Sequence, residues 1–172
     1  MGMTDHFAGV LTQEELRRST GYTMDAAMKH NGALVVIECN EDIPCNPCET
    51  VCPFGAITVG EPITNTPVVA VEKCNGCGQC VAICPGLAVF LVNHDVGGGM
   101  SELTFPYEYL PTPVKGSKVT ATDRAGRDVC DAEVTKVIST KQYSLTNVIT
   151  IRFPAEHIEN VRGIRRLPVC GE

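Results

Sequence analysis

Two cysteine runs, each ending in a Cys-Pro pair, constrain this chain more than any other feature. Residues 33–104 hold eight of its ten cysteines, and these form an internal repeat. Three cysteines of the first run return 32 positions later in the second run: Cys45, Cys48 and Cys52 become Cys77, Cys80 and Cys84. Cys39 returns 35 positions later as Cys74, so the first run has three additional residues after its first cysteine. β-branched stretches before and after each run predict flanking strands.

The second run has the spacing Cys-x2-Cys-x2-Cys-x3-Cys-Pro, which is typical of cysteines that bind [4Fe–4S] clusters. Soft thiolates suit iron–sulfur clusters, and three of them in one tight loop reach three irons of a single cube. The fourth cysteine of each run points away and binds the other cluster. The sequence therefore predicts two ligand sets: Cys39, Cys45, Cys48 and Cys84 for cluster 1, and Cys52, Cys74, Cys77 and Cys80 for cluster 2.

Two alternatives remain open at this point. Paired Cys-x2-Cys units also occur in zinc sites, although two triplets that each continue into Cys-Pro match two four-cysteine zinc sites poorly. The longer spacing after Cys39 leaves the alternative of a three-iron or three-cysteine cluster in the first run. We expect Cys39 to ligate, because it follows its strand as Cys74 follows its own.

Gly76 and Gly78 are expected to let the backbone pass close to a cluster.

The chain divides into three predicted regions within an α+β fold. Residues 1–32 form a partly helical arm, in which a capping box at Thr12–Glu15 opens a short helix that Gly21 ends. A second helix is predicted over Met24–His30. Residues 33–104 form the cysteine domain. Residues 105–172 form a small β-rich domain, a barrel or a sandwich, with strands at KVTATD, EVTKVI and VITIRF and a hairpin turn at 124–127.

The remaining polar and reactive residues have ordinary interpretations. Cys130 and Cys170 lie outside the repeat and are expected to be free thiols in a reducing compartment. Four scattered histidines are expected to be surface or packing residues: His6, His30, His94 and His157. The basic group Arg162, Arg165 and Arg166 is expected to be solvated, or else to meet an acidic partner or a flavin phosphate. The acidic group around the first run is also expected to be solvated: Glu38, Glu41, Asp42 and Glu49.

Composition and missing motifs exclude several functions. The net charge of −6 gives no basic footprint for nucleic acid. The longest apolar run is too short for a membrane span, which needs about 20 residues, and no secretory signal is evident, so we expect a cytoplasmic protein. No GxGxxG, P-loop or GxSxG motif is present, so we expect no catalytic residue in this chain and no cofactor site beyond the cluster ligands.

Residues 33–92 resemble the bacterial two-[4Fe–4S] ferredoxin domain in seven cysteines and both Cys-Pro pairs. That resemblance implies a βαββαβ fold with the clusters inside. The segments IECNEDIPCNPCETVCPFGAI, CNGCGQCVAICPGLAVF and PYEYLPTPVKG together resemble the small iron–sulfur subunit of multi-subunit FAD-dependent amino-acid and amine dehydrogenases, of the proline, hydroxyproline and sarcosine type. This narrower resemblance implies an FAD-containing partner subunit, and often a small [2Fe–2S] subunit as well.

The favoured hypothesis is therefore an electron-transfer subunit in a hetero-oligomer, whose two clusters relay electrons from the reduced flavin of its partner. The chain would then be a non-catalytic part of an oxidoreductase complex. One alternative is a free ferredoxin-like carrier or a subunit of an unrelated redox complex. Another is a non-redox role in which the clusters only stabilise the fold.

Overall fold

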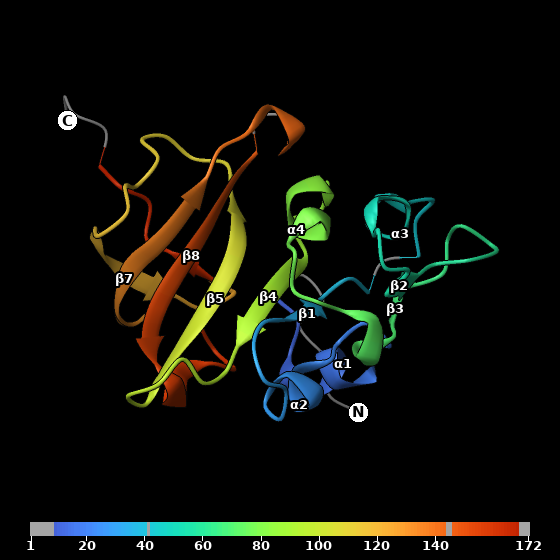
Figure 1. The fold of residues 1–172 in the computed structure, drawn as a ribbon, viewed down its shortest axis with the longest axis horizontal. Helices are drawn as coiled ribbons and strands as arrows, with labels where there is room; N and C mark the ends of the chain where they lie inside the picture. Colours follow the sequence, from blue (N-terminus) through green and yellow to red (C-terminus); the bar gives the residue numbers. More distant parts are fainter. Residues whose placement is uncertain (1–8, 41, 144–145, 169–172) are drawn as a thin grey trace.

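The computed structural model of the chain describes residues 9–40, 42–143 and 146–168. The fold is mixed, mainly β with a few short helices. Seven antiparallel strands form one sheet in the order β1-β4-β5-β8-β7-β6-β9 (Figure 1). These strands are β1 (Leu34–Ile37), β4 (Val89–Asn93), β5 (Met100–Tyr107), β6 (Lys118–Thr122), β7 (Asp128–Ile138), β8 (Asn147–Pro154) and β9 (Gly163–Ile164).

Strands β1 and β4 are covered on both faces, which explains their continuous apolar sequences. All four residues of β1 are buried, and so are the first four of β4. On one face, Leu34 and Val36 pack with Met24 of α2 (Met24–Ala27). On the other face, Val35 and Ile37 belong to a second apolar cluster that includes α4 (Gln79–Ile83). When both faces of a strand are buried, its sequence does not alternate between apolar and polar residues.

The cysteine runs lie between the strands of this part of the sheet. From Leu34 to Asn93 the elements follow in the order β1, α3 (Pro47–Val51), β2 (Ile57–Thr58), β3 (Val68–Val69), α4 and β4, with a 3-10 turn η2 (Val71–Lys73) after β3. The first strand pairs with the last, and β2 pairs with β3 in a separate two-stranded sheet. Helices α3 and α4 pack against each other. The two cysteine runs are thereby brought side by side.

The N-terminal arm packs onto the molecule, and its capping box is confirmed. The Thr12 side chain accepts a bond from Glu15 N–H (3.2 Å), while the Glu15 carboxylate accepts one from Thr12 N–H (2.8 Å). The helix α1 (Gln13–Arg18) ends at Ser19, earlier than predicted. Gly21 has a different role: an added Cβ would lie 3.0 Å from the Ile37 Cβ and the Pro67 oxygen, so a side chain there would force its neighbours apart.

The second predicted helix, over Met24–His30, is shorter in the structure. Helix α2 ends at Ala27, because the next amides bond three residues back and tighten the chain into a turn. Lys29 N–H donates to the Ala26 oxygen and His30 N–H donates to the Ala27 oxygen. Met24 and Ala27 are fully buried, so this part of the arm contributes to the core.

The β-rich part follows the sequence prediction closely. The three predicted strands correspond to β6, β7 and β8, and the turn between β6 and β7 is confirmed. β7 and β8 are joined by a 3-10 turn η3 (Lys141–Tyr143), and η4 (Ala155–His157) follows β8. Residues 105–107, which include Pro106, form the end of β5. There β5 pairs only with β8, because its pairing with β4 ends at Thr104, and a proline is compatible with an unpaired edge.

One hydrophobic core joins the two ends of the sheet. Leu34, Val36 and Phe90 share it with strand residues from the β-rich part, including Ile149, Ile151 and Phe153. Strand β5 runs across the predicted boundary between residues 104 and 105. The division into separate domains stays a prediction. Among the described residues, none of the helices has the length and apolarity to cross a membrane.

Candidate iron–sulfur site

A cavity beside α3 is lined by four cysteines from both runs. They are Cys39, Cys45 and Cys48 from the first run and Cys84 from the second. Apolar residues complete the wall, among them Ile37 and Val89 from the ends of β1 and β4. This is the group of cysteines that the sequence predicted for cluster 1.

A second cavity is lined by the other four cysteines. Cys74, Cys77 and Cys80 come from the second run, and Cys52 comes from the first. Val35, Ile57 and Leu91 form part of the apolar wall. Each cavity therefore offers four thiols in an apolar setting, three from a tight loop and one from the other run. This donor set fits a cube that takes one thiolate for each iron.

Seven of these eight cysteines are buried or partly buried, and Cys77 is exposed. Burial, together with the nearby thiols of Cys84, Cys45 and Cys39, raises the pKa of Cys48 to about 11. Burial likewise raises the pKa of Cys80 to about 12, with contributions from Cys74, Cys77, Cys52 and also Cys48. Because a ligating cysteine must be deprotonated, iron has to displace these protons, and cluster assembly releases them.

The two cavities are lined by residues of two neighbouring helices. Cys48 lies in α3 and Cys80 lies in α4, the two helices that pack together. A pair of redox centres bound there would be neighbours, so an electron could pass from one to the other within this chain.

Local backbone geometry supports both sites in the same way. The Ala56 N–H donates to Cys52 Sγ (3.3 Å), and the Ala88 N–H donates to Cys84 Sγ (3.5 Å). These equivalent bonds follow the two Cys-Pro pairs, and hydrogen bonds to cluster sulfurs are one determinant of cluster potential. Gly76 has a φ of +70°, and a Cβ there would meet the Ala33 oxygen at 2.6 Å. This position requires glycine because of its approach to Ala33, while the expected approach of the loop to a cluster stays a prediction.

Zinc ligation makes a different geometric demand. A structural zinc ion gathers four ligands around one atom. Among the residues that the structure describes, no three His, Cys, Asp or Glu side chains are arranged to share a single metal ion. Separate irons at the corners of a cube do not require that convergence.

Cys39 is held in place by two contacts that sequence reasoning missed. Its carbonyl oxygen accepts a bond from Ser19 Oγ (3.2 Å) in the N-terminal arm. The preceding residue, Glu38, donates its N–H to the Ala88 oxygen (2.8 Å). The backbone of Cys39 is thus tied to both the arm and the segment after the second run.

The Glu38 side chain corrects an expectation. It is not solvated: only 8% of it is exposed, and it lies between two arginines. Arg124 approaches with Nε to Oε2 at 2.8 Å and Nη2 to Oε1 at 2.5 Å, while Arg162 Nε lies 2.6 Å from Oε1. Arg162 was also expected to be solvated, yet its side chain is 3% exposed. The arginines favour the ionised carboxylate, so the pKa of Glu38 is lowered although burial opposes the shift.

No local sequence pattern could have predicted this triad, which consists of Glu38, Arg124 and Arg162. Arg124 is 86 positions from Glu38, and Arg162 is 124 positions away. The Arg162 guanidinium lies over the Phe90 ring, 5.6 Å from its centroid, and bonds the Ile158 oxygen (3.0 Å). Two arginines thus share one carboxylate at the residue before Cys39.

Other candidate residues do not join the cysteine cavities. Cys130 lies in β7 as a free thiol, while Cys170, His6 and Glu41 fall outside the described residues. His157 is paired with Glu156 at 3.4 Å. Arg165 is exposed and paired with Asp128, and Arg166 lies over the Tyr109 ring, 5.7 Å from its centroid.

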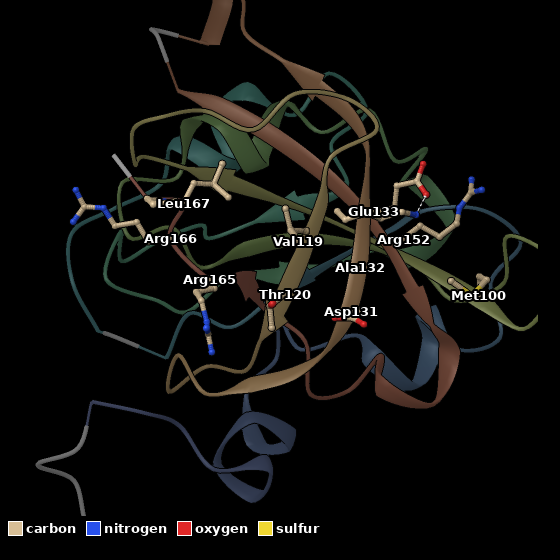
Figure 2. A pocket seen from close by; sticks show the side chains of 12 residues that line it. Met100, Val119, Thr120, Asp131, Ala132, Glu133, Arg152, Arg165, Arg166 and Leu167 are labelled. Atoms are coloured by element: carbon tan, nitrogen blue, oxygen red, sulfur yellow. Dashed lines mark hydrogen bonds and ion pairs between the residues drawn. The ribbon is translucent and has the colours of Figure 1, made fainter. Parts of the chain in front are cut away.

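Figure 2 shows a separate hollow over β6, β7 and the segment 165–168, which none of the described cysteines lines. Most of its charged side chains have an ion-pair partner, either in the hollow or beside it. Lys118 Nζ lies 2.5 Å from Glu133 Oε2, and Arg152 bonds Glu102 at 2.8 Å. We therefore assign the redox chemistry to the cysteine cavities and not to this hollow.

Comparison with known proteins supports the iron–sulfur interpretation. Residues 43–88 match the family model described as a 4Fe-4S dicluster domain. The chain is similar to a subunit of an ion-translocating oxidoreductase complex of Methanosarcina acetivorans, 49% identical over 49 residues that cover 28% of this chain and 17% of the relative. It is similar to a subunit of a Na(+)-translocating ferredoxin:NAD(+) oxidoreductase complex of Acetobacterium woodii, 49% identical over 45 residues, 26% of this chain and 13% of the relative.

A further relative is an uncharacterised ferredoxin of Methanocaldococcus jannaschii, 40% identical over 48 residues that cover 28% of this chain and 30% of the relative. The chain thus spans less than a third of the length of the curated relatives it matches. No solved structure matches it significantly. Residues 43–88 therefore form a segment that binds 4Fe-4S.

Proposed function

We propose that the chain holds two [4Fe–4S] clusters and passes single electrons between them. The observation that supports this most is the division of the eight cysteines between two cavities. Each cavity is lined by three cysteines from one run and one from the other. In the proposal, Cys39, Cys45, Cys48 and Cys84 bind cluster 1, and Cys52, Cys74, Cys77 and Cys80 bind cluster 2. The clusters supply one-electron redox chemistry, while the chain supplies thiolates, amide donors and an apolar wall.

Iron counting and reductive titration test this proposal. Anaerobically purified protein should contain about eight irons for each chain and take up about two electrons from dithionite, one for each cube. About four irons, or a three-iron signal in electron paramagnetic resonance, would contradict the two-cluster proposal. Clusters that accept no electron would favour the purely structural role.

We further propose that the chain works as a subunit of a multi-subunit oxidoreductase. Two of the relatives named above are subunits of such complexes. The narrower proposal, from the resemblance in the cysteine runs, is an FAD-containing dehydrogenase of the amino-acid or amine type as electron donor, with a small [2Fe–2S] subunit as a further component. The alternative is a free ferredoxin-like carrier, which the similarity to an uncharacterised ferredoxin favours.

Anaerobic purification from the native source separates these possibilities. A flavoprotein that co-purifies in fixed ratio with bound FAD would support the dehydrogenase proposal, and its substrate could be screened among amino acids. Co-purification with subunits that carry no FAD would point to an unrelated redox complex. A lone brown protein would support the free carrier.

A further inference from the structure

Cys77 differs from the other proposed ligands because it is exposed. Two grooves meet at this residue, and Tyr143 of η3 lines both of them. One groove runs along α4, past Gln79 and Ile83. Cluster 2, once bound, would therefore approach the surface at Cys77, which makes this the natural point for an electron to enter or leave.

The other groove at Cys77 is basic. It extends across β5, β7 and β8, and its charged residues are Lys115, Lys136, Arg152 and Glu102. Arg152 bonds Glu102 through Nε (3.1 Å) and Nη2 (2.8 Å), so this pair is internally neutral. Lys115 and Lys136 are exposed, and neither forms an ion pair with a described residue. Two positive charges are therefore left uncompensated beside Cys77.

The cavity of cluster 1 has a different electrostatic setting. Within the described part of the chain no basic residue lines it, and the nearby charges of the first loop are acidic. Asp42 is exposed in that loop, and the Glu49 carboxylate accepts a bond from Gly60 N–H (3.4 Å). Arg124 and Arg162 near Cys39 are largely shielded from solvent and paired with Glu38, so the exposed charge at this site is acidic. An acidic partner therefore fits the groove at Cys77 better than the cluster 1 site.

We propose that the basic groove at Cys77 docks an acidic face of a one-electron redox protein. This inference rests on the proposed function, because cluster 2 must be present. In each encounter one electron passes between cluster 2 and the cofactor of the partner, so that one is oxidised as the other is reduced, and no bond forms or breaks. Complementary charge raises the rate of encounter and orients the partner's cofactor toward Cys77.

Stopped-flow oxidation of the dithionite-reduced holoprotein tests the proposal. An acidic flavodoxin and a basic cytochrome c serve as protein probes. For each probe, the second-order rates are compared across variants and salt concentrations, and not with the rates of the other probe. With flavodoxin, the second-order rate should fall as salt rises, and K136E should slow it about tenfold at low salt. K115E should act in the same direction. With cytochrome c, neither substitution should slow the reaction.

Lys29→Glu is the matched control, because it makes the same change of charge at an exposed lysine that lines neither groove. If K29E slows flavodoxin as much as K136E does, the effect is one of net charge and the docking proposal is overturned. A flavodoxin rate that does not fall with salt also overturns it. Unchanged iron content and dithionite uptake in each variant keep these results separate from the proposed function, whose failure would appear as clusters that are missing or not reducible.

Discussion

At the scale of single residues, the proposed ligand sets make Cys84 the decisive cysteine. It belongs to the second run by sequence, yet it lines the cavity of the first. Cys52 has the reciprocal position in the cavity of the second run. The crossed assignment, in which Cys84 and Cys52 each bind the cluster of the other run, remains a prediction. Iron content alone can distinguish it from an assignment in which each run binds its own cluster.

We predict that Cys84→Ser removes the same cluster as Cys45→Ser. Each single variant should lose about half of the iron, because a cube needs four ligands. The double variant Cys45→Ser/Cys84→Ser should lose no more, whereas Cys77→Ser/Cys84→Ser should lose nearly all of it. Iron analysis after anaerobic purification measures these losses. The reverse pattern of losses would show that each run binds its own cluster.

Glu38 shows how one buried charge can link distant parts of the chain. Its carboxylate compensates two guanidiniums that belong to the turn before β7 and to the segment before β9. Removing one member of a buried ion pair leaves uncompensated charge in the interior, which costs more than the pair contributes.

We predict that Glu38→Gln destabilises the protein by about 3–5 kcal/mol, because both arginines lose their carboxylate. Anaerobic urea unfolding followed by circular dichroism measures the change. Glu133→Gln is the control, since the Glu133–Lys118 pair lies at the surface, and its unfolding midpoint should stay close to that of the unmodified protein. Equal midpoints for the two variants would mean that the triad is not a stabilising unit.

At the scale of elements, the loop that carries the second run depends on a close approach to the start of β1. Gly76 combines a positive φ with a backbone oxygen where a Cβ would stand. Gly86, after the second Cys-Pro pair, has neither restriction, because a Cβ added there would meet no described atom within 4 Å.

Gly76→Ala should therefore displace the loop from Cys74 to Cys80 and lose about half of the iron, while Gly86→Ala should keep all of it. Iron content and the visible spectrum of the two variants, purified in parallel, provide the comparison. Full iron in Gly76→Ala would show that the loop can shift without losing its cluster.

At the scale of the whole molecule, the cysteine segment and the β-rich part share strands and a core. β5 pairs with β4 on one side and with β8 on the other. Leu103 and Phe105 of β5 are buried with Ile149 and Ile151 of β8. The cysteine segment therefore shares its packing with the β-rich part, although the family model matches only residues 43–88.

We predict that residues 1–104 expressed alone will not hold a full complement of iron. The truncation removes β8, which leaves apolar residues of β5 exposed, and it removes both arginines that pair with Glu38. Iron content and urea unfolding of the truncated and full chains test this. A truncated chain that folds and binds as much iron as the full chain would show that residues 1–104 do not need the β-rich part.

The elements that were predicted well are those that local chemistry controls. The capping box at Thr12, the hairpin turn after β6 and the strands β6 to β8 depend on a few neighbouring residues. The ends of α1 and α2 were predicted less well, because contacts from distant segments and tight turns decide where these short helices stop.

The sequence by itself determined the iron–sulfur chemistry, because thiolate spacing within a tight loop is a local property that the cluster dictates. Only the tertiary structure decided how Glu38 is used, since burial between Arg124 and Arg162 depends on residues far apart in the chain. It also decided that one sheet joins the cysteine segment to the β-rich part, and that two lysines from the latter lie beside Cys77. Charge and burial of this kind follow from packing, which local pattern does not specify.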